Sequence, residues 1–187
     1  IAVAAPGAKG GTTDIVADES PRRDTCLEKL AALKTVYGSQ TITPGNAPGL
    51  NDGAAFVLMV SRRLADERGL PVLARISHYA QVADGPTSGS YTPAIALARL
   101  LRASGDRPDG LDLLEINEAF AATPLVSTLR LAEGDRDAAA RLRARTNRHG
   151  GAVAIGHPLG ASGARLAMTL VNGLRRRGGG RGAAAIC

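Results

Sequence analysis

Aromatic residues are scarce in this 187-residue chain, and tryptophan is absent. Phe, Tyr and Trp make up 3% of the residues, whereas hydrophobic residues make up 44%. A buried core therefore has to be built from Ala, Val, Leu and Ile. The scarcity also argues against nucleic-acid binding, because basic patches that bind single strands normally alternate with aromatic stacking residues. We expect no nucleic-acid partner, and we assign most of the net charge of +6 to a solvated, arginine-rich surface.

Long apolar runs are missing as well. No run reaches the roughly 20 residues that a membrane-spanning helix needs, and no signal-peptide pattern opens the sequence. We therefore expect a cytoplasmic protein without a membrane partner. Because the sequence begins at Ile1 and stops at Cys187 directly after an apolar run, we expect it to be one piece of a longer polypeptide.

Cysteine is rare, with only Cys26 and Cys187 in the chain. Two distant cysteines without a Cys-x-x-Cys pair form neither a disulfide framework nor a zinc site. We expect reduced thiols.

The hydrophobic pattern predicts a layered α/β fold in which strands alternate with helices around a mixed or parallel sheet. The predicted helices cover 24–37, 61–68, 92–104, 124–132, 138–143 and 162–177. The predicted strands cover 41–43, 54–60, 73–83, 111–116, 151–155 and 183–187. Residues 1–24 are expected to form a loop with one short strand. In such folds, functional residues gather where strands end.

The most informative segment runs from Gly150 to Arg165 and contains Gly156-His157-Pro158. The glycine and the proline restrict the backbone around the histidine, and the predicted strand before it places it at a strand end. A neutral imidazole can donate a hydrogen bond to a thioester oxygen or accept a proton from a thiol. We therefore predict a catalytic role for His157, although an isolated histidine is more often structural.

Asn117 and Cys187 stand at two other predicted strand ends. The Asn117 amide could orient a water or substrate oxygen in an oxyanion hole, or the residue could cap a helix. Cys187 could act as acid, base or nucleophile, or serve as a small hydrophobic residue. Gly160, Ser162 and Gly163 form a turn of small residues, which we interpret as close packing of strand and helix.

Together these segments resemble the thiolases, the acyl-coenzyme A C-acetyltransferases. The resemblance covers nearly the whole chain in the right order, and the Gly-His-Pro segment is its most specific part. The matching segments are 45–47, 51–55, 117–122, 150–165 and Cys187.

The resemblance implies a fold of two similar layered halves with a loop domain inserted in the first half. We expect the chain to hold the end of the loop domain (1–40), the last strands of the N-terminal half (41–70) and a C-terminal thiolase domain that stops before its last strand (71–187). It also implies that the nucleophilic cysteine of the family lies outside this sequence, so that the chain alone is inactive.

The implied chemistry is acyl transfer between coenzyme A thioesters, either thiolytic cleavage of 3-oxoacyl-coenzyme A or the reverse Claisen condensation. His157 would activate the nucleophilic cysteine and, with a water held by Asn117, polarise the substrate carbonyl. Cys187 would move the proton at the α-carbon of acetyl-coenzyme A. Acyl-coenzyme A and acetyl-coenzyme A are then the small-molecule partners, and no metal or bound organic cofactor is implied, because coenzyme A acts as a substrate. A role in fatty acid metabolism is expected, and the full-length protein is expected to be a homodimer or homotetramer.

The resemblance also implies a set of coenzyme A contacts: Arg22, Leu33, Tyr37, Ala47, Ala119 and Phe120. Pro48 departs from the family pattern, which has serine there, so a hydroxyl near the pantetheine is lost. Residues 82–92 are shorter and residues 133–148 longer than in acetoacetyl-specific members.

Three alternatives remain open at the level of sequence. The chain could be a non-catalytic thiolase-like protein that binds acyl-coenzyme A or lipid. It could be a related condensing enzyme such as a ketoacyl synthase, although those typically lack a cysteine at the position of Cys187. It could also be a subunit whose site is completed by a partner chain that carries the nucleophile.

Overall fold

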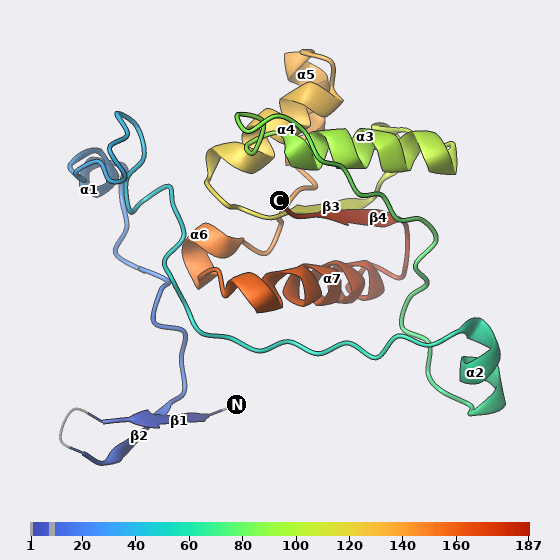
Figure 1. The fold of residues 1–187 in the computed structure, drawn as a ribbon, viewed down its shortest axis with the longest axis horizontal. Helices are drawn as coiled ribbons and strands as arrows, with labels where there is room; N and C mark the ends of the chain where they lie inside the picture. Colours follow the sequence, from blue (N-terminus) through green and yellow to red (C-terminus); the bar gives the residue numbers. More distant parts are fainter. Residues whose placement is uncertain (1, 8–9) are drawn as a thin grey trace.

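The central layer of the fold is a pair of parallel strands, β3 (Leu113–Ile116) and β4 (Gly182–Ala185). Their register pairs Leu113 with Gly182 and Ile116 with Ala185. The computed structural model describes residues 2–7 and 10–187. Helices α3 (Thr92–Ser104) and α4 (Ala122–Leu131) lie on one face of the pair, and α7 (Leu159–Arg176) lies on the other (Figure 1). This arrangement confirms the predicted layered α/β fold.

The core between these layers is aliphatic, as the composition predicts. Every residue of β3 is buried, and each large aliphatic side chain removed from water stabilises the fold by about 1.5–3 kcal/mol. Gly182 lets α7 approach β4, because a Cβ there would lie 2.6 Å from a Leu170 methyl carbon and 3.0 Å from the Leu113 carbonyl oxygen. The buried cluster consists of Leu97, Leu101, Leu111, Leu114, Ile116, Ala183 and Ala185.

The remaining elements are short. An antiparallel hairpin, β1 (Val3–Pro6) and β2 (Thr12–Ile15), stands near the N-terminus. Helices α1 (Leu27–Ala31) and α2 (Arg62–Glu67) lie away from the central layers (Figure 1). A 3-10 turn precedes β3, and two further helices follow α4: η1 (Pro108–Gly110), α5 (Arg136–Arg143) and α6 (Ala152–Ile155).

Several predicted elements are confirmed with small shifts at their ends. Helix α3 carries a proline in its first turn and ends at Gly105, which takes the left-handed conformation that glycine adopts without strain. Helix α2 is capped by Ser61, and β3, α4, α5 and β4 fall where the pattern places them. Helix α7 starts at Leu159 rather than at Ser162. The first 15 residues hold two strands rather than one.

Other predictions are wrong. The helix predicted at 24–37 shrinks to α1, and residues 151–155 form helix α6 instead of a strand. The strands predicted at 41–43, 54–60 and 73–83 are absent, and of the residues the structure describes, none between 16 and 112 belongs to a strand.

The apolar segments around 54–60 and 73–83 run extended across the molecule (Figure 1) and are mostly exposed. Phe56 is 88% exposed and Leu58 is 81% exposed. A strand buried on both faces needs neighbouring strands and covering helices. The described part of the chain places no neighbouring strand beside these segments, so they do not form a sheet despite their apolar pattern.

None of the described helices is both long enough and apolar enough to cross a bilayer.

Candidate active site

Asn117 follows directly after β3 and is completely buried. Its backbone N–H donates to the Ala185 carbonyl at 2.9 Å, which ties the end of β3 to β4. Its side-chain Nδ2 lies 3.2 Å from His157 Nε2, and its Oδ1 is buried without a hydrogen bond from the described residues. The helix-cap alternative is excluded, because α4 begins five residues later with Ala121 at its N-cap.

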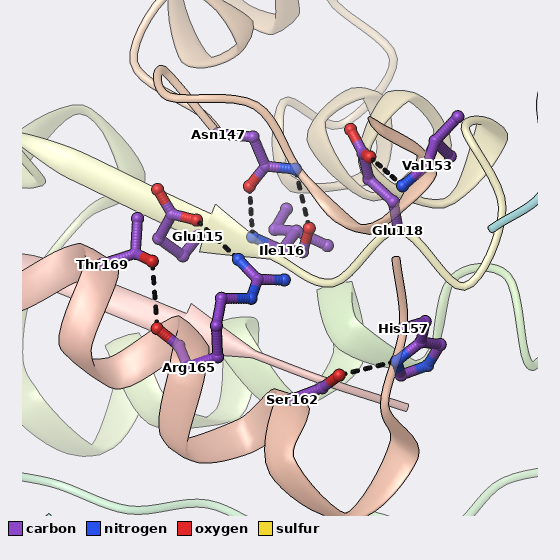
Figure 2. Close-up of polar contacts among 9 residues, drawn as sticks. All are labelled: Glu115, Ile116, Glu118, Asn147, Val153, His157, Ser162, Arg165 and Thr169. Atoms are coloured by element: carbon purple, nitrogen blue, oxygen red, sulfur yellow. Dashed lines mark hydrogen bonds and ion pairs between the residues drawn. The ribbon is translucent and has the colours of Figure 1, made fainter. Parts of the chain in front are cut away.

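Asn147 holds the backbone just before Asn117. Its Oδ1 accepts from the Ile116 N–H at 2.9 Å, and its Nδ2 donates to the Ile116 carbonyl at 2.8 Å (Figure 2). Asn147 takes a left-handed conformation, with φ 47°, which asparagine tolerates better than most residues. Sequence reasoning missed this residue, and its one signal was an asparagine next to the glycine-rich turn before His157.

His157 lies between α6 and α7, and its side chain is 9% exposed. Its Nδ1 lies 2.7 Å from Ser162 Oγ, in the first turn of α7 (Figure 2). The Ser162 hydroxyl in turn donates to the Pro158 carbonyl at 3.0 Å. The segment before His157, predicted as a strand, is thus helix α6. His157 and Asn117, which are 40 positions apart, nevertheless meet in one buried site.

The backbone at His157 is held by the segment that contains Asn51. The His157 N–H donates to Asn51 Oδ1 at 3.2 Å. Gly156 has φ +96°, and a Cβ on it would overlap the Asn51 side chain, so this position needs glycine for both reasons. Gly53 similarly leaves room for the Pro158 ring. An open pocket of about 320 Å³ lies between residues 51–56 and 158–161.

Glu118 fixes the short helix α6. Its carboxylate accepts from the Val153 N–H at 2.9 Å. Gly151 faces the same carboxylate, and a Cβ there would lie 2.5 Å from it. Gly151 thus allows the Glu118 side chain to approach the backbone closely.

A buried carboxyl group and a partly buried guanidinium lie close to the site. Glu115 of β3 is 4% exposed, and its Oε2 lies 3.9 Å from Nη1 of Arg165 on α7 (Figure 2). Burial raises the pKa of Glu115 to about 7, against the pull of Arg165. Burial, followed by the positive charge of Arg165, lowers the pKa of His157 below its ordinary value of 6.5. His157 is therefore a neutral imidazole at neutral pH.

Cys187 lies two residues beyond β4, whose end is tied to Asn117. The residue is exposed, but desolvation of its thiol raises its pKa above the ordinary 9.0. No hydrogen bond among the described residues joins Cys187 to Asn117 or His157. The structure thus brings Asn117 and His157 into contact and leaves Cys187 as a protonated thiol at the neighbouring strand end.

The predicted coenzyme A contacts divide into two groups. Buried Ala47 neighbours Asn46, whose carbonyl accepts from the Ala121 N–H at 2.8 Å, so the 41–49 turn packs beside Ala119 and Phe120. Leu33 lines an open pocket of about 500 Å³ that the 41–49 turn also lines. Arg22 and Tyr37 are exposed.

The chain matches two family models along its length. Residues 1–63 match the model described as thiolase, N-terminal domain, and residues 70–187 match the model described as thiolase, C-terminal domain. The described residues contain no cluster of three or more His, Cys, Asp or Glu side chains that could hold a metal ion.

Similar proteins carry thiolase names. A β-ketoadipyl-CoA thiolase of Acinetobacter baylyi is 42% identical over 188 residues, which cover 100% of this chain and 45% of that protein. An acetyl-CoA acetyltransferase of Pseudomonas aeruginosa is 43% identical over 183 residues, covering 97% of this chain and 44% of that protein. The chain therefore spans less than half the length of these curated relatives.

A solved structure shows the same arrangement of elements. The crystal structure of the Bacillus anthracis acetyl-CoA acetyltransferase superposes with a TM-score of 0.86 at 37% sequence identity. The match covers 100% of this chain and 45% of that one. With both family models matched and a buried Asn117–His157 pair at the site, the chain belongs to the thiolase family.

Proposed function

We propose that the polypeptide carrying this sequence transfers acyl groups between coenzyme A thioesters, by thiolytic cleavage of 3-oxoacyl-coenzyme A or by the reverse condensation. The observation that carries the proposal is the buried contact of 3.2 Å between Asn117 Nδ2 and His157 Nε2. It sets a hydrogen-bond donor beside a neutral imidazole, which is the pair that a developing thioester oxyanion or enolate requires.

In the first step of cleavage, His157 accepts the proton of a nucleophilic cysteine thiol. The thiolate attacks the 3-oxo carbonyl of the substrate, and the bond between the α- and β-carbons breaks. The electron pair of that bond leaves with acetyl-coenzyme A as its enolate. Hydrogen bonds from His157 and Asn117 stabilise the enolate oxygen. The Cys187 thiol protonates the enolate carbon. Its raised pKa suits this role, because the group carries its proton at neutral pH.

In the second step, the Cys187 thiolate takes the proton of the coenzyme A thiol, and the coenzyme A sulfur attacks the acyl carbon. The bond from the acyl carbon to the nucleophilic cysteine breaks, and the departing thiolate recovers its proton from His157, so that both cysteine thiols are regenerated. Neither Cys26, exposed at the start of α1, nor Cys187 stands in the position of this nucleophile. We propose that it belongs to the part of the thiolase length that the present sequence does not cover, so that the 187 residues alone are inactive.

We assign coenzyme A contacts to Leu33, Ala47, Ala119 and Phe120, supported by the hydrogen bond that joins the 41–49 turn to the Asn117 turn. Arg22 and Tyr37 are proposed to join them through their exposed side chains. The predicted domain division at 40 and 70, a role in fatty acid metabolism, a cytoplasmic location and a homo-oligomeric state belong to the same proposal.

The test is an assay of the complete polypeptide with acetoacetyl-coenzyme A and longer 3-oxoacyl-coenzyme A esters. His157→Ala, Asn117→Ala and Cys187→Ala are each expected to lower kcat by at least about a hundredfold. His78→Ala, at an exposed position outside the regular elements, is the matched control and is expected to leave kcat unchanged.

Tight binding of every ester without turnover by the parent protein would instead support the non-catalytic acyl-coenzyme A binding alternative. Activity that appears only after a second chain is added would support the two-chain alternative. The exposed apolar segments at 54–60 and 73–83 are compatible with further protein covering that face.

A further inference from the structure

The hydrogen bonds around His157 determine which of its two ring nitrogens carries the proton. Ser162 Oγ has a single hydrogen, and two acceptors lie within its reach, the Pro158 carbonyl at 3.0 Å and His157 Nδ1 at 2.7 Å. When the hydroxyl donates to the carbonyl, the contact with Nδ1 takes its proton from the ring. Both contacts of Ser162 are then hydrogen bonds, with Nδ1 protonated and Ser162 accepting from it.

The other side of the ring agrees with this assignment. With Nδ1 protonated in a neutral imidazole, Nε2 carries a lone pair. The Asn117 amide nitrogen lies 3.2 Å away and can donate to it. The ring then donates to Ser162, Ser162 donates to the Pro158 carbonyl, and Asn117 donates to Nε2, so each contact has one hydrogen.

The opposite tautomer makes one hydrogen bond fewer. A proton on Nε2 would require the Asn117 amide to be turned so that Oδ1 faces the ring. The Ser162 hydroxyl would have to donate to Nδ1 and would lose its contact with the Pro158 carbonyl, which would keep only the Ala161 and Ser162 N–H donors. Because Ser162 is 1% exposed, solvent does not replace the lost hydrogen bond, so the Nδ1–H form is favoured.

We propose that Ser162 is a positioning residue that holds His157 as the Nδ1–H tautomer, so that Nε2 enters the reaction as the unprotonated nitrogen beside Asn117. The inference rests on the proposed acyl transfer, in which Nε2 first accepts a thiol proton and then donates a hydrogen bond. A ring protonated at Nε2 cannot accept that proton there. The small-residue turn at the start of α7 thus has a chemical role in addition to packing.

The tautomer can be measured without any assay of activity. In the complete polypeptide labelled with ¹⁵N-histidine, the two ring nitrogens of a neutral imidazole have well-separated chemical shifts, and the signals of His157 are assigned by their loss in His157→Asn. At pH 7.5 the parent protein is expected to show a protonated Nδ1 and an unprotonated Nε2. Ser162→Ala is expected to shift the population toward the Nε2–H form.

Kinetics give the second readout. Ser162→Ala is expected to lower kcat about tenfold, the loss that corresponds to one hydrogen bond. It should leave KM nearly unchanged, because Ser162 is buried against the His157 ring and the Pro158 carbonyl. Ser127→Ala is the matched control. Ser127 is equally buried, on α4, and its hydroxyl has no hydrogen-bond partner among the described residues, so neither the tautomer nor kcat should change.

The outcomes separate the two proposals. A parent protein with a protonated Nε2, or a Ser162→Ala variant with an unchanged tautomer, overturns the role of Ser162 whatever the activity. An Nδ1–H ring that depends on Ser162 in a protein without turnover supports the positioning and overturns the proposed function instead.

Discussion

At the scale of single residues, Asn117 and His157 each depend on a neighbour that was not itself a candidate for the chemistry. Asn117 sits on a backbone held by Asn147, and His157 is held by Ser162 through its ring and by Asn51 through its backbone. Asn147 and Asn51 reach the site from distant segments, whereas Ser162 lies five positions from His157. Substitutions of these supporting residues should therefore alter the proposed reaction while sparing substrate contacts.

The Cys187 thiol should react slowly with alkylating reagents at neutral pH. Desolvation raises its pKa above 9.0, so the thiolate is a minor species at pH 7, and the rate with iodoacetamide should rise about tenfold per pH unit between pH 7 and pH 9. Mass spectrometry of the peptide that contains Cys187 gives the rate, and exposed Cys26 in the same digest reports that the reagent has access. A plateau below pH 8 would contradict the raised pKa.

Gly156→Ala should damage both the fold and the site. The residue has φ +96°, and an added Cβ meets the Asn51 side chain, which holds the His157 backbone. We expect a loss of about 1–3 kcal/mol in the free energy of unfolding and a fall in kcat, measured by denaturant unfolding and by the thiolysis assay. Gly163→Ala is the matched control, since that glycine lies inside α7 with open space around it. An equal effect of the two substitutions would count against this explanation.

At the scale of elements, the helices whose ends are marked by local chemistry are those that the pattern locates well. Helix α3 has its first-turn proline and its terminal glycine, and α2 has its serine cap. The short helix α6 has neither mark: its N-cap is Gly151, with no side-chain cap. It is held by Glu118 from a distant turn, so local propensity did not reveal it.

Ser61→Ala should loosen α2. The Ser61 hydroxyl accepts from the Leu64 N–H at 3.2 Å, and removal of an N-cap acceptor costs about 1 kcal/mol. The hydrogen-exchange protection of the first-turn amides of α2 should fall about fivefold. Ser61→Asp keeps an acceptor at the cap and should retain the protection. Equal loss in both variants would show that the cap does not determine the stability of this helix.

At the scale of the whole molecule, an aliphatic sandwich of α3 and α4, β3 and β4, and α7 carries the site at one end of its two strands (Figure 1). The acid–base pair Glu115 and Arg165 lies across the contact between β3 and α7. The contact is too long for a hydrogen bond, and the buried Glu115 Oε2 and Arg165 Nη2 have no hydrogen bond among the described residues. Hydrogen bonds therefore do little to offset the free-energy cost of burying this ion pair.

The stability of the molecule should consequently depend on Glu115 and on pH. The pKa of Glu115 is raised from 4.5 to about 7, so the folded state keeps this proton where the unfolded state has lost it. The contribution of Glu115 to stability falls as pH rises from about 4.5 through 7. Glu115→Gln should be nearly neutral at pH 5 and should stabilise the complete polypeptide by roughly 1–3 kcal/mol at pH 8.

Denaturant unfolding at the two pH values gives the comparison, and Glu67→Gln, on the exposed helix α2, is the matched control. Destabilisation by Glu115→Gln at pH 8 would mean that the carboxylate is well compensated in the folded protein.

The sequence by itself determined the aliphatic composition of the core, the layered α/β class and the family, and it singled out Asn117, His157 and Cys187 as candidate site residues. These depend on local periodicity, on turn chemistry and on motifs whose residue types suit the proposed reaction. Thus β3, α3, α4, α5 and β4 could be predicted from neighbouring residues alone.

Only the tertiary structure decided that residues 151–155 form a helix, that the apolar segments 54–60 and 73–83 do not form strands, and that Asn147 and Ser162 support the reactive residues. All of these outcomes but the Ser162 contact depend on contacts between residues far apart in the chain, or on their absence. The Ser162 contact spans five positions and depends on how the turn into α7 folds. A strand forms only where another strand supplies its hydrogen bonds, and a histidine tautomer is set only by the groups that face its two nitrogens. Such partners are fixed by packing and not by local pattern.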